Sequence, residues 1–170
     1  AMGLLDRLGS ASEQGNNLRK LVDSLSRNDE TVAIFEPVTS CLLTYRFSSA
    51  ESVSKVVAGG VAPASKRSYE RFLDLGEMDT FPHKQVANNE DAQILANRVK
   101  EEFGADHGIS VLANLDGTAR QKVFIGLNIL DRNKGVFEQK IDFQQEDLEE
   151  KIVSSVLEVF AREYGRTNRY

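Results

Sequence analysis

The segment 31–35, TVAIF, constrains the fold more than any other part of the chain. Its residues are small, β-branched or aromatic, and such a run is typical of a central strand covered by helices on both faces. Pro37 follows, and because proline lacks a backbone N–H it suits the end of that strand. Thr39 and Ser40 are then expected to N-cap a helix over 41–45. This strand–turn–helix unit predicts an α/β protein.

The rest of the chain alternates between helical and extended patterns. Apolar residues spaced by three and four predict helices, and short β-branched runs predict strands. We expect a short helix ending at a turn near Gly9–Ser10, and helices over 12–26, 65–73, 88–104 and 146–164. We expect strands over 56–62, 109–112, 123–130 and 136–143, with a hairpin turn at 131–135.

This order predicts one domain over 1–170, folded as a three-layer α/β/α sandwich with a mixed sheet. Within that domain we expect the N-terminal helices in 1–29 and a frayed tail over 165–170.

Charge and composition exclude several classes of function. The net charge of −5 argues against nucleic acid as the main partner, because phosphate contacts need clustered Lys and Arg. The sequence has no apolar run of 18 residues and no apolar N-terminal stretch, so we expect neither a membrane span nor a signal peptide. Cys41 is the only cysteine, which excludes an internal disulfide and fits a cytoplasmic location.

The common cofactor motifs are also missing from the sequence. It contains no GxxxxGK[ST] loop, no GxGxxG and no GxSxG elbow. His83 and His107 are the only histidines, so a zinc site would need mostly carboxylate ligands. We therefore expect no cofactor and no metal, and we interpret both histidines as hydrogen-bonded structural residues.

Several short segments, taken in order, resemble a known family. They are EPVTSCLL over 36–43, SSA over 48–50, GGV over 59–61, Ser65 at the start of a helix, His83, and FGADHGI over 103–109. Over about residues 30–160 this order is similar to the CinA C-terminal domain family, which includes nicotinamide-mononucleotide deamidases. The family pattern runs ESCTGGLL, GSS, GGVVAYSNEAK, HGAVS and LGADIGLAVTGIAGPDGG. The resemblance implies an α/β/α fold, a homo-oligomer and a nucleotide-like ligand.

The positions that carry catalysis in the family differ in this chain. Pro37 stands where the family has its nucleophilic serine, and Val38 stands at the family cysteine. Ser40–Cys41 replaces the glycine pair of the first motif, and Ala64 and Tyr69 replace the tyrosine and the lysine of GGVVAYSNEAK. A serine nucleophile needs a hydroxyl and a base to take its proton, and here both are replaced. The resemblance therefore implies that the deamidase site has been lost.

Four residues are candidates for ligand binding. Thr39 and Ser40 at a helix start could hold an anion, since free N–H groups favour negative charge there, although plain capping is the simpler interpretation. Ser65 matches a family serine, with helix capping as the alternative. Asn114 lies in the loop 113–118, which is shorter than the glycine-rich loop of the family. The segment 144–146 is acidic where the family has a basic residue, which is a poor setting for phosphate.

Three functional hypotheses follow. The first is a non-catalytic protein of this family with a binding or assembly role. The second is an amidohydrolase on nicotinamide mononucleotide or a related small amide, with a relocated pair, Ser40 and Lys66, each one helical turn from the lost position. The third is a small-ligand sensor whose pocket is remodelled by Val38, Ala64 and Leu115.

Two further features have a structural and a functional interpretation. Cys41 is either a buried packing residue or a thiol activated by the helix start. The pair Gly59–Gly60 either permits close packing of strands or subunits, or contacts a ligand.

Overall fold

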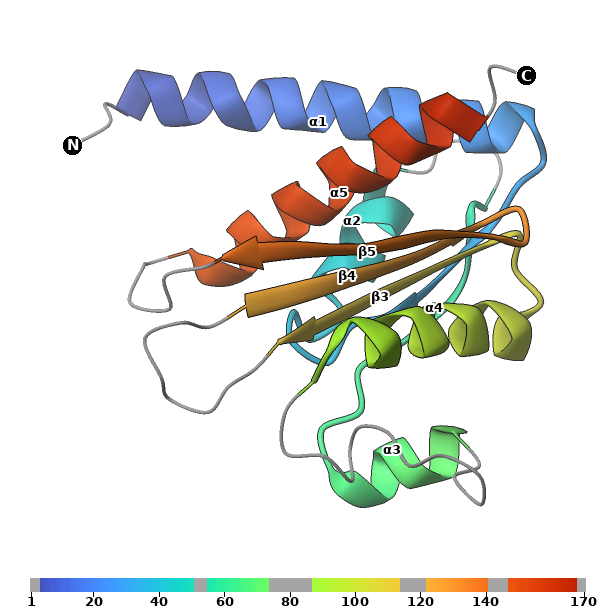
Figure 1. Ribbon diagram of the computed structural model, residues 1–170. Coiled ribbons are helices and arrows are strands. Elements are labelled where there is room, and N and C mark those ends of the chain that lie inside the picture. The colour runs from blue at the N-terminus through green and yellow to red at the C-terminus, as the bar shows by residue number, and fades with distance from the viewer. Residues whose placement is uncertain (1–3, 51–54, 74–86, 114–121, 141–146, 168–170) are drawn as a thin grey trace.

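A five-stranded mixed sheet organises the chain in this computed structural model (Figure 1). The structure describes residues 4–50, 55–73, 87–113, 122–140 and 147–167. The helices are α1 (Leu4–Arg27), α2 (Leu42–Ala50), α3 (Lys66–Leu73), α4 (Asn89–Phe103) and α5 (Leu148–Thr167). The strands are β1 (Val32–Phe35), β2 (Val57–Val61), β3 (His107–Ala113), β4 (Lys122–Ile129) and β5 (Arg132–Lys140).

The strand order is β2-β1-β3-β4-β5. β1 runs parallel to both of its neighbours, β2 and β3, whereas β4 and β5 extend the sheet as antiparallel strands. Helices α1, α2 and α5 pack on one face and α4 packs on the other, so the predicted α/β/α sandwich with a mixed sheet is confirmed (Figure 1). All four residues of β1 are fully buried, as a central strand between two helical layers requires.

The boundaries of α4 follow the sequence closely. Asn88 is the N-cap and forms a capping box with Asp91, and Gly104 ends the helix in a left-handed conformation with φ 59°. The expected inward face is also confirmed, because Ala92, Leu95 and Val99 are buried against the sheet.

Three predicted boundaries are wrong. The turn near Gly9–Ser10 is absent, because α1 continues as one helix, which tolerates an interior glycine at a cost of about 1 kcal/mol. The hairpin turn comprises only Leu130 and Asp131, with φ 50° and 61°, and β5 begins at once rather than after residue 135. Gly165–Thr167 is helical rather than frayed, and the Thr167 hydroxyl donates to the Glu163 carbonyl at 2.9 Å.

Candidate functional site

The carboxyl end of β1 is the place in this topology where a ligand is expected. The chain leaves β1 for β2 on one side and later returns to β3 on the other side, with α2 and α4 on opposite faces. In open sheets of this kind, ligands bind outside the carboxyl ends of the strands where the strand order reverses. The segment 36–41, which joins β1 to α2, lies at this edge and carries most of the residues that the sequence singled out.

Glu36 is the residue around which this edge is built. Its side chain is fully buried, and its two carboxylate oxygens accept four hydrogen bonds. The backbone N–H of Leu43 donates to Oε2 at 2.9 Å, and that of Thr44 donates to Oε1 at 2.7 Å. The hydroxyls of Thr39 and Thr44 supply the other two bonds. A carboxylate at a helix start also complements the helix dipole, so the contacts and the charge act together.

Glu36 therefore caps α2, and the prediction that Thr39 or Ser40 is the cap is wrong. Thr39 is buried and uses its hydroxyl to hold the Glu36 carboxylate. The N–H groups of Leu43 and Thr44 are occupied by the chain's own carboxylate. Sequence reasoning missed Glu36, because glutamate is not among the residues preferred at N-caps and it lies six positions before the first residue of α2.

Gly59–Gly60 permits close packing of helices against β2. A Cβ atom at Gly60 would lie 2.4 Å from the Thr44 hydroxyl oxygen, which is one of the donors to Glu36. A Cβ atom at Gly59 would lie 2.1 Å from the ring of Phe103 on α4. Both glycines therefore make room for side chains of the covering helices, and not for a neighbouring strand or subunit as the sequence suggested, and Gly60 also makes room for the Glu36 network.

Ser40 and Cys41 both have left-handed backbone conformations, with φ 49° and 68°. These are the two positions where the resembling family has its glycine pair, and glycine adopts this conformation without steric cost. The left-handed pair turns the chain so that α2 starts above the Glu36 carboxylate. Ser40 is exposed and Cys41 is half-buried. Burial and the nearby Glu36 raise the pKa of the Cys41 thiol, which opposes its activation as a nucleophile.

The residues that the resemblance matches to the family's cysteine and lysine, Val38 and Tyr69, are packing groups. Val38 is half-buried and packs against the core. Tyr69 is buried on α3, and its ring meets that of Phe35 edge-on with centroids 5.5 Å apart. Burial raises the pKa of the Tyr69 hydroxyl. Ala64 is exposed and carries no chemistry of its own.

Of the remaining candidate residues, the structure describes the side chain of Ser65 alone. Ser65 is exposed and its hydroxyl accepts from the Ser68 N–H at 3.2 Å, so it caps α3 as expected. Lys66 is the first residue of α3, and its side chain lies outside the described part of the structure. Asn114 and His83 both lie outside the described residues.

His107 is a structural residue far from this edge. It lies at the amino end of β3 opposite Val32, it is fully buried, and its Nε2 is 3.1 Å from Oε2 of Glu30. Burial lowers its pKa. Within the described ranges, no group of three or more His, Cys, Asp or Glu side chains could hold a metal ion. No helix in the same ranges is long and apolar enough to cross a membrane.

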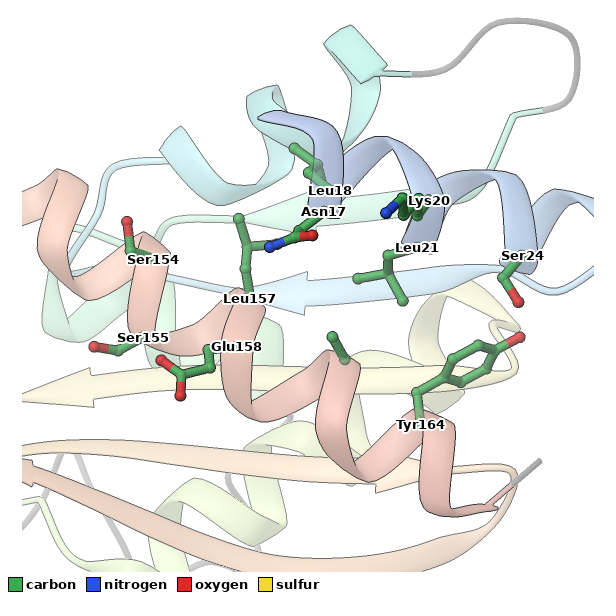
Figure 2. A pocket seen from close by; sticks show the side chains of 11 residues that line it. Asn17, Leu18, Lys20, Leu21, Ser24, Ser154, Ser155, Leu157, Glu158 and Tyr164 are labelled. Carbon is green, nitrogen blue, oxygen red and sulfur yellow. The ribbon is translucent and has the colours of Figure 1, made fainter. Parts of the chain in front are cut away.

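A cleft lies between α1 and α5, away from this edge (Figure 2). This cleft has a volume of about 570 Å³, within the usual range for a binding cavity. Leu18 and Leu21 on α1 and Leu157 on α5 form its apolar part, and Tyr164 closes one end. None of the predicted site residues lines it.

Comparisons with known proteins agree with the architecture. Residues 16–163 match the family CinA, described as the CinA C-terminal domain. A putative competence-damage inducible protein from Streptococcus pneumoniae (strain Hungary19A-6) is 29% identical over 112 residues, which is 63% of this chain and 27% of that protein. The chain therefore spans about a quarter of the length of the curated relatives it matches.

Solved structures resemble the chain over most of its length. The competence or damage-inducible protein from Enterobacter asburiae has a TM-score of 0.74 at 19% identity, covering 89% of this chain and 98% of its own. A CinA superfamily protein from Klebsiella pneumoniae 700603 has a TM-score of 0.74 at 14% identity, covering 90% and 98%. At these identities the likeness shows the fold.

Proposed function

Because the chain belongs to the CinA C-terminal domain family, we propose that it is a non-catalytic member with a binding or assembly role. In this proposal the carboxyl edge of β1 binds a small nucleotide-like molecule without the amide hydrolysis that the resemblance implies for the family. The observation that carries the proposal is Pro37, which directly follows Glu36 at the end of β1 and stands at the family's nucleophilic serine.

The chemistry around Pro37 supports this proposal. Proline has no side-chain nucleophile, and a nucleophilic mechanism needs both a nucleophile and a base within hydrogen-bond reach. The nearby carboxylate, Glu36, already accepts four hydrogen bonds and has no free acceptor site facing a substrate proton. The raised pKa of Cys41 keeps its thiol protonated at neutral pH.

The edge nevertheless keeps the features of a binding site. It lies where the strand order reverses, and the left-handed turn at Ser40–Cys41 holds the backbone in one fixed path above buried Glu36. Ser40 is exposed there and offers a hydroxyl to a ligand. Val38 is half-buried and makes the same edge partly apolar. A partly apolar edge also fits the hypothesis of a small-ligand sensor.

The test combines binding and turnover on the same protein. Nicotinamide mononucleotide is titrated into the purified chain by calorimetry, and ammonia release is followed in parallel with a known family deamidase as the positive control. We expect binding without ammonia release. Ammonia release that Ser40→Ala abolishes and Cys41→Ala leaves intact would favour the relocated Ser40/Lys66 amidohydrolase and contradict the proposal. Absence of both binding and release would leave only the assembly role.

A further inference from the structure

The cleft between α1 and α5 is preformed, because its floor belongs to the core and one of its ends is fixed by a hydrogen bond (Figure 2). Leu18 and Leu21 on this floor are buried in the larger of the two hydrophobic clusters, and Leu157 packs against that cluster. At one end, the Tyr164 hydroxyl donates a hydrogen bond to Oε2 of Glu30 at 2.6 Å. Because the walls of the cleft are already ordered, a ligand loses little binding free energy to ordering the protein.

Four polar side chains line the cleft and form no hydrogen bond or ion pair within the part of the chain that the structure describes. They are Asn17 and Lys20 on α1, and Ser155 and Glu158 on α5. Lys20 and Glu158 are exposed and place opposite charges on opposite walls (Figure 2). A ligand with a single charge is attracted by one wall and repelled by the other, whereas a ligand that carries both charges is attracted by both. The charges of the cleft therefore favour a zwitterion.

The floor and the volume of the cleft restrict the ligand further. Its volume of about 570 Å³ lies within the range of small-molecule sites, which bury a largely apolar ligand and orient it with a few polar groups. The leucine floor needs an apolar group of substantial area, since burial of apolar surface supplies most of the binding free energy at such a site. An α-amino acid with an aromatic or large aliphatic side chain combines these features, because its ammonium and carboxylate groups lie on the carbon atom that carries the apolar side chain.

We propose that the cleft between α1 and α5 binds a free α-amino acid with a large apolar side chain. Lys20 pairs with the carboxylate of the ligand, Glu158 pairs with its ammonium group, and the apolar side chain lies on the leucine floor. The amide of Asn17 and the hydroxyl of Ser155 supply neutral hydrogen bonds to the same polar groups of the ligand. This site is separate from the edge around Glu36 and takes a different class of ligand, so its failure and that of the proposed function are distinct results.

The test uses tryptophan as the probe, because the full chain contains no tryptophan and the fluorescence of the ligand is then observed alone. Protein is titrated into tryptophan, and the fluorescence anisotropy is expected to rise and saturate. Tryptamine lacks the carboxylate and N-acetyltryptophan lacks the ammonium group. Each is expected to bind about fivefold more weakly than tryptophan, which is the fold-change that corresponds to the loss of one exposed ion pair of ~1 kcal/mol. A flat titration up to about 1 mM protein overturns the proposal, as does equal binding of tryptophan and both analogues.

Two variants test which wall binds which charge of the ligand. Lys20→Gln is expected to weaken tryptophan about fivefold and to leave tryptamine unchanged, and Glu158→Gln to weaken tryptophan equally and to leave N-acetyltryptophan unchanged. Arg19→Gln and Glu149→Gln are the matched controls, because they make the same charge changes at exposed positions that do not line the cleft. Both controls are expected to bind like the parent, and circular dichroism verifies that every variant stays folded. Parent-like binding of tryptophan by Lys20→Gln and Glu158→Gln overturns the assignment of the site to this cleft.

Discussion

Replacing Glu36 by glutamine tests the structural account of the edge most sharply, because the change keeps the shape of the side chain. Each carboxylate oxygen accepts one backbone N–H and one threonine hydroxyl. Either orientation of the new amide therefore turns its NH₂ group toward a backbone donor, Leu43 or Thr44. The threonine hydroxyl on that side can rotate to accept a hydrogen bond, but the backbone N–H cannot.

The loss of unfolding free energy that follows from this geometry is about 2–4 kcal/mol. A hydrogen bond to a charged group contributes about 1.5–3 kcal/mol, and one such bond is lost to a buried N–H. Loss of the negative charge at the start of α2 adds about 0.3–1 kcal/mol. For a chain of this size, 1 kcal/mol corresponds to about 2–4 °C in Tm, so we expect Tm to decrease by roughly 4–16 °C.

The assay is equilibrium urea unfolding of the parent and of Glu36→Gln, with Glu101→Gln as the control. Glu101 is exposed on α4, so its replacement is expected to change the free energy of unfolding by no more than about 0.5 kcal/mol. If Glu36→Gln is as stable as that control, the capping role assigned to Glu36 is refuted.

Three other predictions follow from single residues. Ser40→Gly and Cys41→Gly should each stabilise the fold by about 0.5–1 kcal/mol in urea unfolding, since relief of the left-handed strain exceeds the entropy cost of glycine; a loss of stability would count against the strain. Gly60→Ala should destabilise by about 1–3 kcal/mol, because its Cβ would clash with Thr44; unchanged unfolding would rule the clash out. Burial lowers the pKa of His107 below its ordinary 6.5, so the unfolded chain takes up the proton first as pH falls and stability should decrease below about pH 6.5; His107→Gln should flatten that decrease, and an unaltered pH profile would contradict it.

The local patterns of the sequence predict the elements that depend on neighbouring residues. The strand β1 was visible because a continuous apolar run needs cover on both faces, and α4 was visible because Asn88 and Gly104 are strong end signals. The same logic predicted the sandwich and the mixed sheet, since a hairpin after parallel strands leaves few other arrangements.

The features that the sequence did not reveal depend on contacts across the turn between β1 and α2. The Glu36 side chain reaches seven residues ahead to cap α2, and it can do so only because Ser40 and Cys41 adopt a conformation that neither residue type signals. The cleft between α1 and α5 was also hidden, because it depends on how two helices far apart in the sequence lie against each other.

The measurement that tests the central claim most directly is ammonia release from nicotinamide mononucleotide by the native chain, followed for hours at high protein concentration. Because Pro37, two residues after β1, stands where the resemblance places the family's nucleophile, the account predicts no release above the protein-free background while the control deamidase turns over fully. Sustained release that scales with protein concentration and is abolished by Ser40→Ala would contradict it, and would mean that the catalytic hydroxyl has moved into the turn before α2.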